Sequence, residues 1–212
     1  MSRVVAIFDV DQTLVQGYTE RLFFRYLVRR RRLSLPRALA YLGKAACRPR
    51  DRFQDKTYLQ GLPVEEVVSL ARQCYRQDIT PRVSPAGRAC IRSHQAQGHA
   101  VALLSGSLSL LLAPLQEELG ADWLLATELQ QRNGQFTGAI NGLHPRGLNK
   151  LHLLQELSRT QGFDLSQAYA YGDHIQDAYL FRSIGYPVAV NPSWRLKRRA
   201  RKHGWPIRYF TR

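Results

Sequence analysis

The sequence is short of three things: cysteine, acidic side chains and long hydrophobic runs. Its 212 residues include three cysteines, and 16 aspartates and glutamates against 31 lysines and arginines. It also has no internal repeat and no low-complexity linker. With 44% hydrophobic and 22% charged residues, the chain has the composition of a globular protein, and its length suits one domain with an inserted module.

The cysteines exclude two kinds of stabilised scaffold. Cys47, Cys74 and Cys90 are too few and too widely spaced to form a zinc site or a disulfide framework. We therefore expect buried free thiols in a reducing compartment, which predicts a cytoplasmic location.

No hydrophobic run is long enough to predict a membrane span. The most apolar window, Ala100–Leu115, contains Gly106 and three serines, and it is too short and too polar to cross a bilayer. Near the N-terminus, Asp9 and Asp11 interrupt the apolar stretch, so no secretory signal is predicted.

The shortage of acids leaves a formal net charge of +15. Such a charge favours anionic partners, whether phosphorylated small molecules, nucleic acid or an anionic lipid surface. A coat of solvated arginines on a soluble protein explains the same composition equally well, so charge alone does not choose between these interpretations.

Apolar runs that alternate with helical patterns predict an α/β fold. The predicted strands are 4–9, 99–105, 122–127, 168–172 and 186–190. The predicted helices are 86–97, 107–119, 147–160, 175–183 and 193–203. This alternation indicates a parallel sheet with helices on both faces. The pair Asn133-Gly134 lies between two alternating runs and predicts a β-hairpin extension.

The stretch 16–80 departs from this rhythm. It has long helical patterns, and it carries 14 lysines and arginines against six acids. We interpret 16–80 as a helical insert after the first strand, and 1–15 together with 81–212 as the catalytic core.

The first predicted strand ends in two acids. Asp9 and Asp11 are two residues apart, and such residues point the same way on an extended chain. Two carboxylates so close repel each other unless a cation or a proton lies between them. The pair therefore indicates a site for a cation and an anionic group.

Other polar residues follow the later strands. Ser105 and Gly106 come just before a predicted helix, whose free amides would form an anion site. Asp173 and Asp177 follow the strand 168–172, and Lys150 lies at the start of a helix. Because ligands of open α/β sheets bind beyond the carboxyl ends of the strands, we expect these side chains to gather at one rim.

The order and spacing of these segments resemble a known family. DVDQT, LLSGS, Lys150 and GDHIQD are similar to the four motifs of the haloacid dehalogenase superfamily, and the insert resembles its type-1 cap. Longer segments resemble subfamily IB, the phosphoserine-phosphatase-like hydrolases: FQDKTYLQGL, GHAVALLSGS, YAYGDHIQDAYL and GYPVAVNPSWRLKRRARKHGWPI. The resemblance implies a Rossmann-like sheet with a helical cap inserted after the first strand.

The resemblance also implies a Mg²⁺-dependent phosphomonoester hydrolase that works through an aspartyl-phosphate. Asp9 would be the nucleophile, and Asp11 the general acid and then the base. Asp9, the backbone carbonyl of Asp11 and Asp173 would hold Mg²⁺. Asp177 would not bind the metal itself; it would orient either the metal's waters or Asp173.

The remaining motif residues would bind substrate. Ser105 and the Gly106 amide would hold the phosphoryl oxygens, while Lys150 neutralises them and Asp9. Dehalogenases of the superfamily lack an acid two residues after the nucleophile, so the presence of Asp11 favours phosphate-ester chemistry. His174, Gln176 and the bulky Gln12 depart from the usual motif residues, and we expect the departures to tune activity.

The substrate class implied is a small phosphorylated metabolite, such as phosphoserine or histidinol phosphate, or an anionic lipid headgroup phosphate. In phosphoserine phosphatases a cap glutamate meets the substrate's amino group and an arginine meets its carboxylate. Here Glu20 comes two residues later than that spacing, and Asp55 or Lys56 stands near the arginine's position. Phosphoserine is therefore not favoured.

A rival hypothesis is a catalytically weak binding protein that holds anionic lipid or RNA through its basic surface. Arg29–Arg32 and the basic tail 195–202 suit a peripheral contact with an anionic membrane, but they also suit a solvated face. No specific nucleic acid is expected, because no recognition module is visible. The intact set of acids, serine and lysine favours the enzyme.

Overall fold

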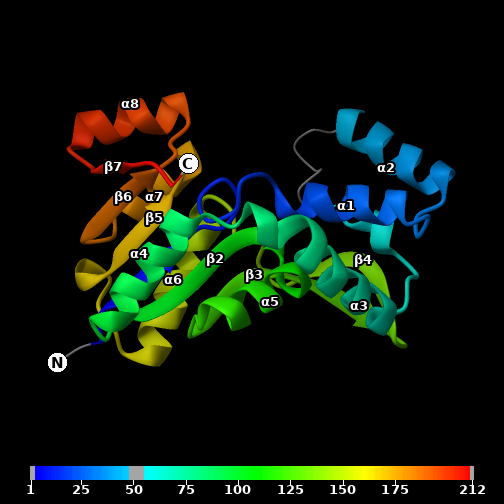
Figure 1. The fold of residues 1–212 in the computed structure, drawn as a ribbon, viewed down its shortest axis with the longest axis horizontal. Helices are drawn as coiled ribbons and strands as arrows, with labels where there is room; N and C mark the ends of the chain where they lie inside the picture. Colours follow the sequence, from blue (N-terminus) through cyan, green and yellow to red (C-terminus); the bar gives the residue numbers. More distant parts are fainter. Residues whose placement is uncertain (1–2, 48–54, 211–212) are drawn as a thin grey trace.

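A seven-stranded sheet forms the centre of the molecule (Figure 1). The structure is a computed structural model that describes residues 3–47 and 55–210. The strand order is β4-β3-β2-β1-β5-β6-β7, and only β3 and β4 pair antiparallel. The strands are β1 (Val5–Phe8), β2 (Ala100–Leu108), β3 (Trp123–Arg132), β4 (Gln135–Asn141), β5 (Tyr169–Gly172), β6 (Tyr186–Val190) and β7 (Ile207–Arg208).

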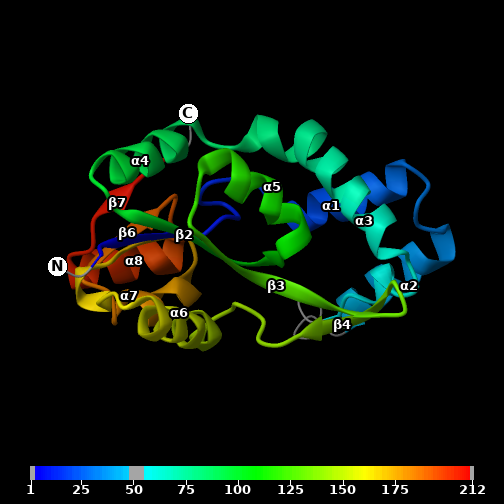
Figure 2. The same ribbon diagram turned by 90° about the horizontal axis from the view of Figure 1, so that it is seen from below.

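Helices cover both faces of the sheet (Figure 2). One face carries α4 (Pro85–Ala96) and α5 (Ser109–Leu119). The other face carries α6 (Leu148–Gln161), α7 (Ala178–Phe181) and α8 (Trp194–His203). Side chains of β1 alternate between two cores: Ala6 and Phe8 pack on the α4/α5 side, and Val5 and Ile7 on the other. A strand buried on both faces must be apolar throughout, which explains the N-terminal run.

The helical insert lies between β1 and α4. Its helices are α1 (Thr19–Arg29), α2 (Leu35–Cys47) and α3 (Val64–Cys74). Its short turns are η2 (Thr57–Leu59), the π-helical η3 (Tyr75–Ile79) and the 3₁₀ turn η4 (Thr80–Arg82).

The β3–β4 hairpin reaches over to hold the insert, as Figure 1 shows beside α1 and α3. The Gly61 amide donates to the Phe136 carbonyl (2.8 Å), and the Phe136 amide donates to the Leu62 carbonyl (3.1 Å). Gly138 has a φ of 83°, and a Cβ there would lie 3.1 Å from the Thr57 Cα. Glycine at this position therefore permits the close approach of hairpin and insert.

The predicted fold class is confirmed, including the alternation of strands and helices and the hairpin at Asn133-Gly134, whose φ angles are 50° and 73°. One strand boundary was predicted wrongly, and one strand was missed. The strand predicted over 122–127 continues to Arg132, because β4 pairs with the added length. The strand β7 was missed, since two residues carry no recognisable pattern.

The helix predicted over 175–183 was also wrong in form. It is a 3₁₀ turn, η6 (Ile175–Asp177), followed by the four-residue α7. The Asp177 carboxylate accepts the His174 amide (3.0 Å), and this side-chain cap tightens the first turn.

The thiols and helices bear on the expected location. Cys74 is buried and Cys90 is half-buried, but Cys47 is exposed, so the prediction of buried thiols was wrong for Cys47. Within 3–47 and 55–210, no helix is long and apolar enough to cross a bilayer. The cytoplasmic location stays a prediction.

His94 is the centre of a buried polar group under the sheet. Its Nε2 lies 2.7 Å from the Tyr171 hydroxyl, and its Nδ1 lies 2.9 Å from Nδ1 of His99. Burial, His99 and Arg208 lower the pKa of His94 from 6.5 to about 4. The folded protein therefore favours the neutral imidazole.

Because the folded pKa of His94 lies below the unfolded one, its contribution is complete above pH 6.5 and is lost as the pH falls toward 4. We expect His94→Gln to reduce the acid-induced loss of unfolding free energy between pH 7 and pH 4 by about 1–3 kcal/mol. Urea unfolding at several pH values measures it. Equal pH dependence in both proteins would contradict the assignment.

A substitution at Gly185, just before β6, tests the packing of the sheet. Its amide donates to the Leu165 carbonyl (3.1 Å), and a Cβ at this position would overlap the Ser166 carbonyl. Gly185→Ala should therefore lower the unfolding free energy by about 3 kcal/mol or more. Gly43→Ala in α2 is the matched control, because its Cβ meets open space. Similar melting temperatures for the two variants would refute the packing argument.

Candidate active site

Three central strands end at the same rim of the sheet, where the strand order reverses. β1 lies between β2 and β5, with Phe8 opposite both Leu103 and Tyr171. Asp9 follows Phe8 directly, while Ser105 and Asp173 follow their partners by two residues. The register therefore delivers all three side chains to the rim at which open α/β sheets bind ligands.

Lys150 joins this rim from α6. Its Nζ donates to Asp9 Oδ1 (2.6 Å) and to Asp177 Oδ1 (2.8 Å), and the residue is 7% exposed. Burial lowers the pKa of Lys150, but Asp177 and Asp9 raise it well above its ordinary value. The two carboxylates therefore favour the charged ammonium, which links three elements that are distant in sequence.

The carboxylates around Lys150 outnumber it. Burial raises the pKa of Asp9 to about 7; Lys150 opposes this rise, and Asp177 and Asp11 add to it. Burial, Asp9 and Asp177 raise the pKa of Asp173 to about 9. The site thus has an excess of buried negative charge that one ammonium does not balance.

This charge excess fits a divalent cation. The oxygen atoms of Asp9 and Asp173 and the backbone carbonyl of Asp11 are the kind of donors that Mg²⁺ prefers. Among the described residues, no three His, Cys, Asp or Glu side chains form a metal cluster by themselves. A cation here would therefore complete its shell with the carbonyl and with water, as Mg²⁺ commonly does.

Asp11 has different partners from Asp9. Its Oδ1 accepts the Thr19 amide (2.9 Å) and its Oδ2 accepts the Ser107 hydroxyl (2.6 Å). The Thr19 hydroxyl in turn donates to Ser107 Oγ (2.7 Å). Burial raises the pKa of Asp11, and the bonds from Ser107 and Thr19 oppose the rise. The expectation that Asp9 and Asp11 point the same way rested on an extended chain. The chain is not extended here, because β1 ends at Phe8 and Gln12 has a φ of 64°.

Ser105 and Gly106 lie within β2, and not before a helix. The strand continues to Leu108 and α5 begins at Ser109, so the argument from a helix N-terminus was wrong. Ser105 is 1% exposed, and its Oγ accepts the Ser107 amide (3.2 Å). The buried Ser105 hydroxyl and the amides of this part of β2 still lie beside β1, the strand that Asp9 follows.

The sequence argument missed the support behind Gly106. The Thr127 hydroxyl donates to the Gly106 carbonyl (2.7 Å) and lies 2.8 Å from His144 Nδ1. Burial, followed by Lys56, Arg146 and Lys150, lowers the pKa of His144 to about 4. A Cβ on Gly106 would lie 3.2 Å from the His144 ring, a tight contact that the ring would have to shift to accommodate. No local pattern signals these contacts.

A buried ion pair of the insert, between Lys56 and Glu20, lies close to the contacts behind Gly106. Lys56 Nζ donates to both carboxylate oxygens of Glu20 (2.7 Å each), and the Tyr58 hydroxyl donates to Glu20 Oε1 (3.1 Å). Lys56 is 1% exposed. Asp55, the other candidate at this position, accepts the Thr57 amide instead (2.8 Å). Glu20 directly follows Thr19, the partner of Asp11, so the pair lies beside the rim.

Comparison with known proteins agrees with this arrangement. The family model of haloacid dehalogenase-like hydrolases matches residues 6–182. Phosphoserine phosphatase SerB1 of Mycobacterium tuberculosis is 30% identical, over 97% of this chain and 70% of its own length. Histidinol-phosphatase of Neisseria meningitidis is 27% identical, over 97% of this chain and 98% of its own.

Solved structures share the fold. A Bordetella pertussis protein of unknown function has a TM-score of 0.90 and 25% identity, with full coverage of both chains. Apo phosphoserine phosphatase has a TM-score of 0.70 and 22% identity, over 99% of this chain and 94% of its own. The chain therefore belongs to the haloacid dehalogenase-like hydrolases and is phosphoserine-phosphatase-like.

Proposed function

We propose that this hydrolase cleaves small phosphomonoesters through an aspartyl-phosphate formed on Asp9. The observation that carries the proposal is the buried Asp9 carboxylate, held by Lys150 at the carboxyl end of β1, with Asp11 two residues away. Mg²⁺ dependence and an aspartyl-phosphate are typical of the family, and the relatives named as phosphatases support the same reaction class.

In the first step a carboxylate oxygen of Asp9 attacks phosphorus, and the bond to the leaving alcohol breaks. Asp11 gives its proton to the leaving oxygen, and its raised pKa favours the protonated form that this step needs. In the second step Asp11 accepts a proton from water, whose oxygen attacks phosphorus and releases phosphate from Asp9.

The surrounding residues hold the phosphoryl group. Ser105 and the Gly106 amide bind its oxygens, and Lys150 balances its charge together with that of Asp9. Asp9, the Asp11 carbonyl and Asp173 would hold Mg²⁺, which when bound neutralises phosphoryl oxygens. Asp177 fixes the orientation of Lys150 and caps the turn at His174.

We further propose that the insert, residues 16–80, acts as a cap over a core of 1–15 and 81–212 and reads the leaving group. The Glu20–Lys56 pair supports this, because it combines both charge signs beside Asp11's partner Thr19. A leaving group with an amino function, as in phosphoserine or histidinol phosphate, would meet Glu20. A lipid headgroup substrate and peripheral membrane contact stay predictions that no observation supports.

The nucleophile is tested by Asp9→Asn. Because an amide cannot form the aspartyl-phosphate, Mg²⁺-dependent release of phosphate from p-nitrophenyl phosphate should fall by about 10³-fold or more. Glu156→Gln, an exposed substitution on α6, should leave the rate unchanged. Retention of a tenth of the wild-type rate by Asp9→Asn, or equal loss in both variants, would refute the role of Asp9.

The cap's role in selectivity is tested by Lys56→Met. Loss of this charge should lower kcat/KM for phosphoserine and histidinol phosphate about tenfold relative to p-nitrophenyl phosphate. The reason is that phosphoserine and histidinol phosphate carry charged groups beyond the ester, whereas p-nitrophenyl phosphate does not. Lys56→Arg should retain the ratio. Melting curves identify damage to the fold. An equal fall for all three esters would show that Lys56 does not read the leaving group.

A further inference from the structure

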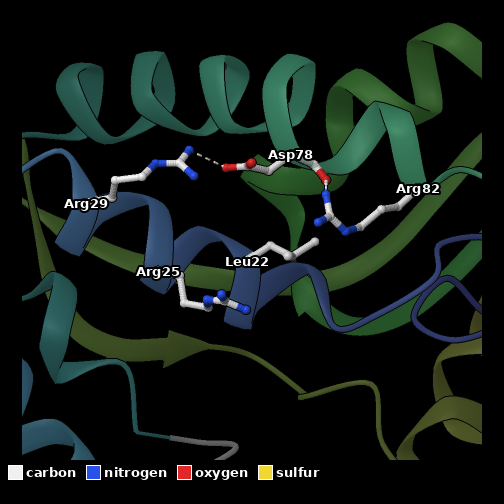
Figure 3. A pocket seen from close by; sticks show the side chains of 5 residues that line it. All are labelled: Leu22, Arg25, Arg29, Asp78 and Arg82. Carbon is white, nitrogen blue, oxygen red and sulfur yellow. Dashed lines mark hydrogen bonds and ion pairs between the residues drawn. The ribbon is translucent and has the colours of Figure 1, made fainter.

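A polar cavity lies between α1 and the segment that leads back to the sheet (Figure 3). We call it the arginine cavity; its volume is about 80 Å³, and its lining residues are Leu22, Arg25, Arg29, Asp78 and Arg82. The first three come from α1, Asp78 from η3 and Arg82 from η4. The cavity is therefore formed between the first helix of the insert and the segment that returns to the sheet.

The arginine cavity has an excess of positive charge. Three arginines and one aspartate line it. Arg29 donates to Asp78 Oδ2 (2.8 Å), and Arg82 donates to the Asp78 backbone carbonyl. Figure 3 shows Arg29 and Arg82 held on either side of Asp78, while Arg25, one turn before Arg29 on α1, lines the cavity from the other side of Leu22. Guanidinium groups that line one cavity are suited to phosphate and similar oxyanions.

The cavity is separate from the proposed active site. Leu22, Arg25 and Arg29 are three and four residues apart, so they share one side of α1. At 100° per residue, Glu20 lies on the opposite side of this helix, where it pairs with Lys56. An anion bound by the arginines would therefore not lie beside the Glu20–Lys56 pair, and none of the proposed catalytic residues lines the cavity.

The position of the cavity gives an anion a mechanical effect. Arg82 lies at the base of the insert, where its carbonyl accepts the Gln16 amide (2.9 Å) and Val83 bridges to Val15. Arg25 lies two turns into α1, which begins at Asp11's partner Thr19. A bridge between Arg25 and Arg82 would join the two segments that connect the insert to the sheet.

We propose that the arginine cavity binds one tetrahedral oxyanion, either inorganic phosphate or the phosphate group of a metabolite, and thereby fixes the insert against the sheet. The site is independent of the catalytic one, so the proposal extends beyond phosphate-ester hydrolysis. Because free phosphate is also the product of the proposed reaction, product accumulation would stabilise this arrangement of the insert.

The test is calorimetric titration of inorganic phosphate into the metal-free full-length protein at constant ionic strength. Without Mg²⁺ the carboxylates at the rim repel phosphate, so wild type should show one class of site. Arg25→Gln and Arg82→Gln should each weaken binding at least tenfold, whereas Ser105→Ala should leave the affinity of the cavity for phosphate unchanged. Arg76→Gln is the matched control, because Arg76 is an exposed arginine of η3 outside the cavity.

Several results would overturn the proposal. One is phosphate binding that responds to Ser105→Ala and not to Arg25→Gln; it would leave the hydrolase proposal intact. Another is an equal effect of Arg76→Gln, which would show general attraction to a basic surface. Arg25→Gln is the decisive variant should Arg82→Gln fail to fold, because Arg25 is exposed. Comparing the affinity for inorganic phosphate with the affinity for a glucose phosphate shows whether the cavity prefers the free ion or the phosphate group of a metabolite.

Discussion

One buried ammonium among four carboxylates is the interaction on which the site depends. Lys150 reaches from α6 to Asp9 after β1 and to Asp177 after β5. Without it, Asp9, Asp173 and Asp177 would repel one another in a place where burial already raises the pKa of Asp9 and Asp173. The ion pairs therefore tie the start of α6 to the segments that follow β1 and β5, and they leave a negative excess that suits a cation and a phosphoryl group.

A second network ties the insert to the same chemistry. Asp11 accepts hydrogen bonds from Thr19, the first residue of α1, and from Ser107 of β2. A shift of α1 would therefore change the partners of Asp11, and with them the pKa of the proposed acid. The next residue of α1, Glu20, holds the buried Lys56. The residues proposed for leaving-group recognition and the partner of the proposed acid thus share one short segment of helix, so in this proposal the position of the cap would control turnover.

Much of this arrangement was predictable from the order of residues. Continuous apolar runs indicated buried parallel strands, and parallel strands bring their carboxyl ends to one edge, so Asp9, Ser105 and Asp173 were expected together. Boundaries were less predictable, because side chains override local preference. Asp177 turns back to cap His174 and shortens the expected helix. β2 runs through Gly106 to Leu108 because β3 continues to pair with it at Thr127.

The sequence by itself determined the direction and burial of each central strand and the chemical types that reach the rim. These follow from hydrophobic period and from the polar residues that end each strand. Only the tertiary structure decided several of the contacts: Lys150 with Asp177 across 27 positions, Lys56 and not Asp55 with Glu20 across 36, and His144 behind Gly106. The reason is physical. Local patterns specify the path of an element, whereas the pairing of buried charges depends on where separate elements pack and on which groups lose their water together.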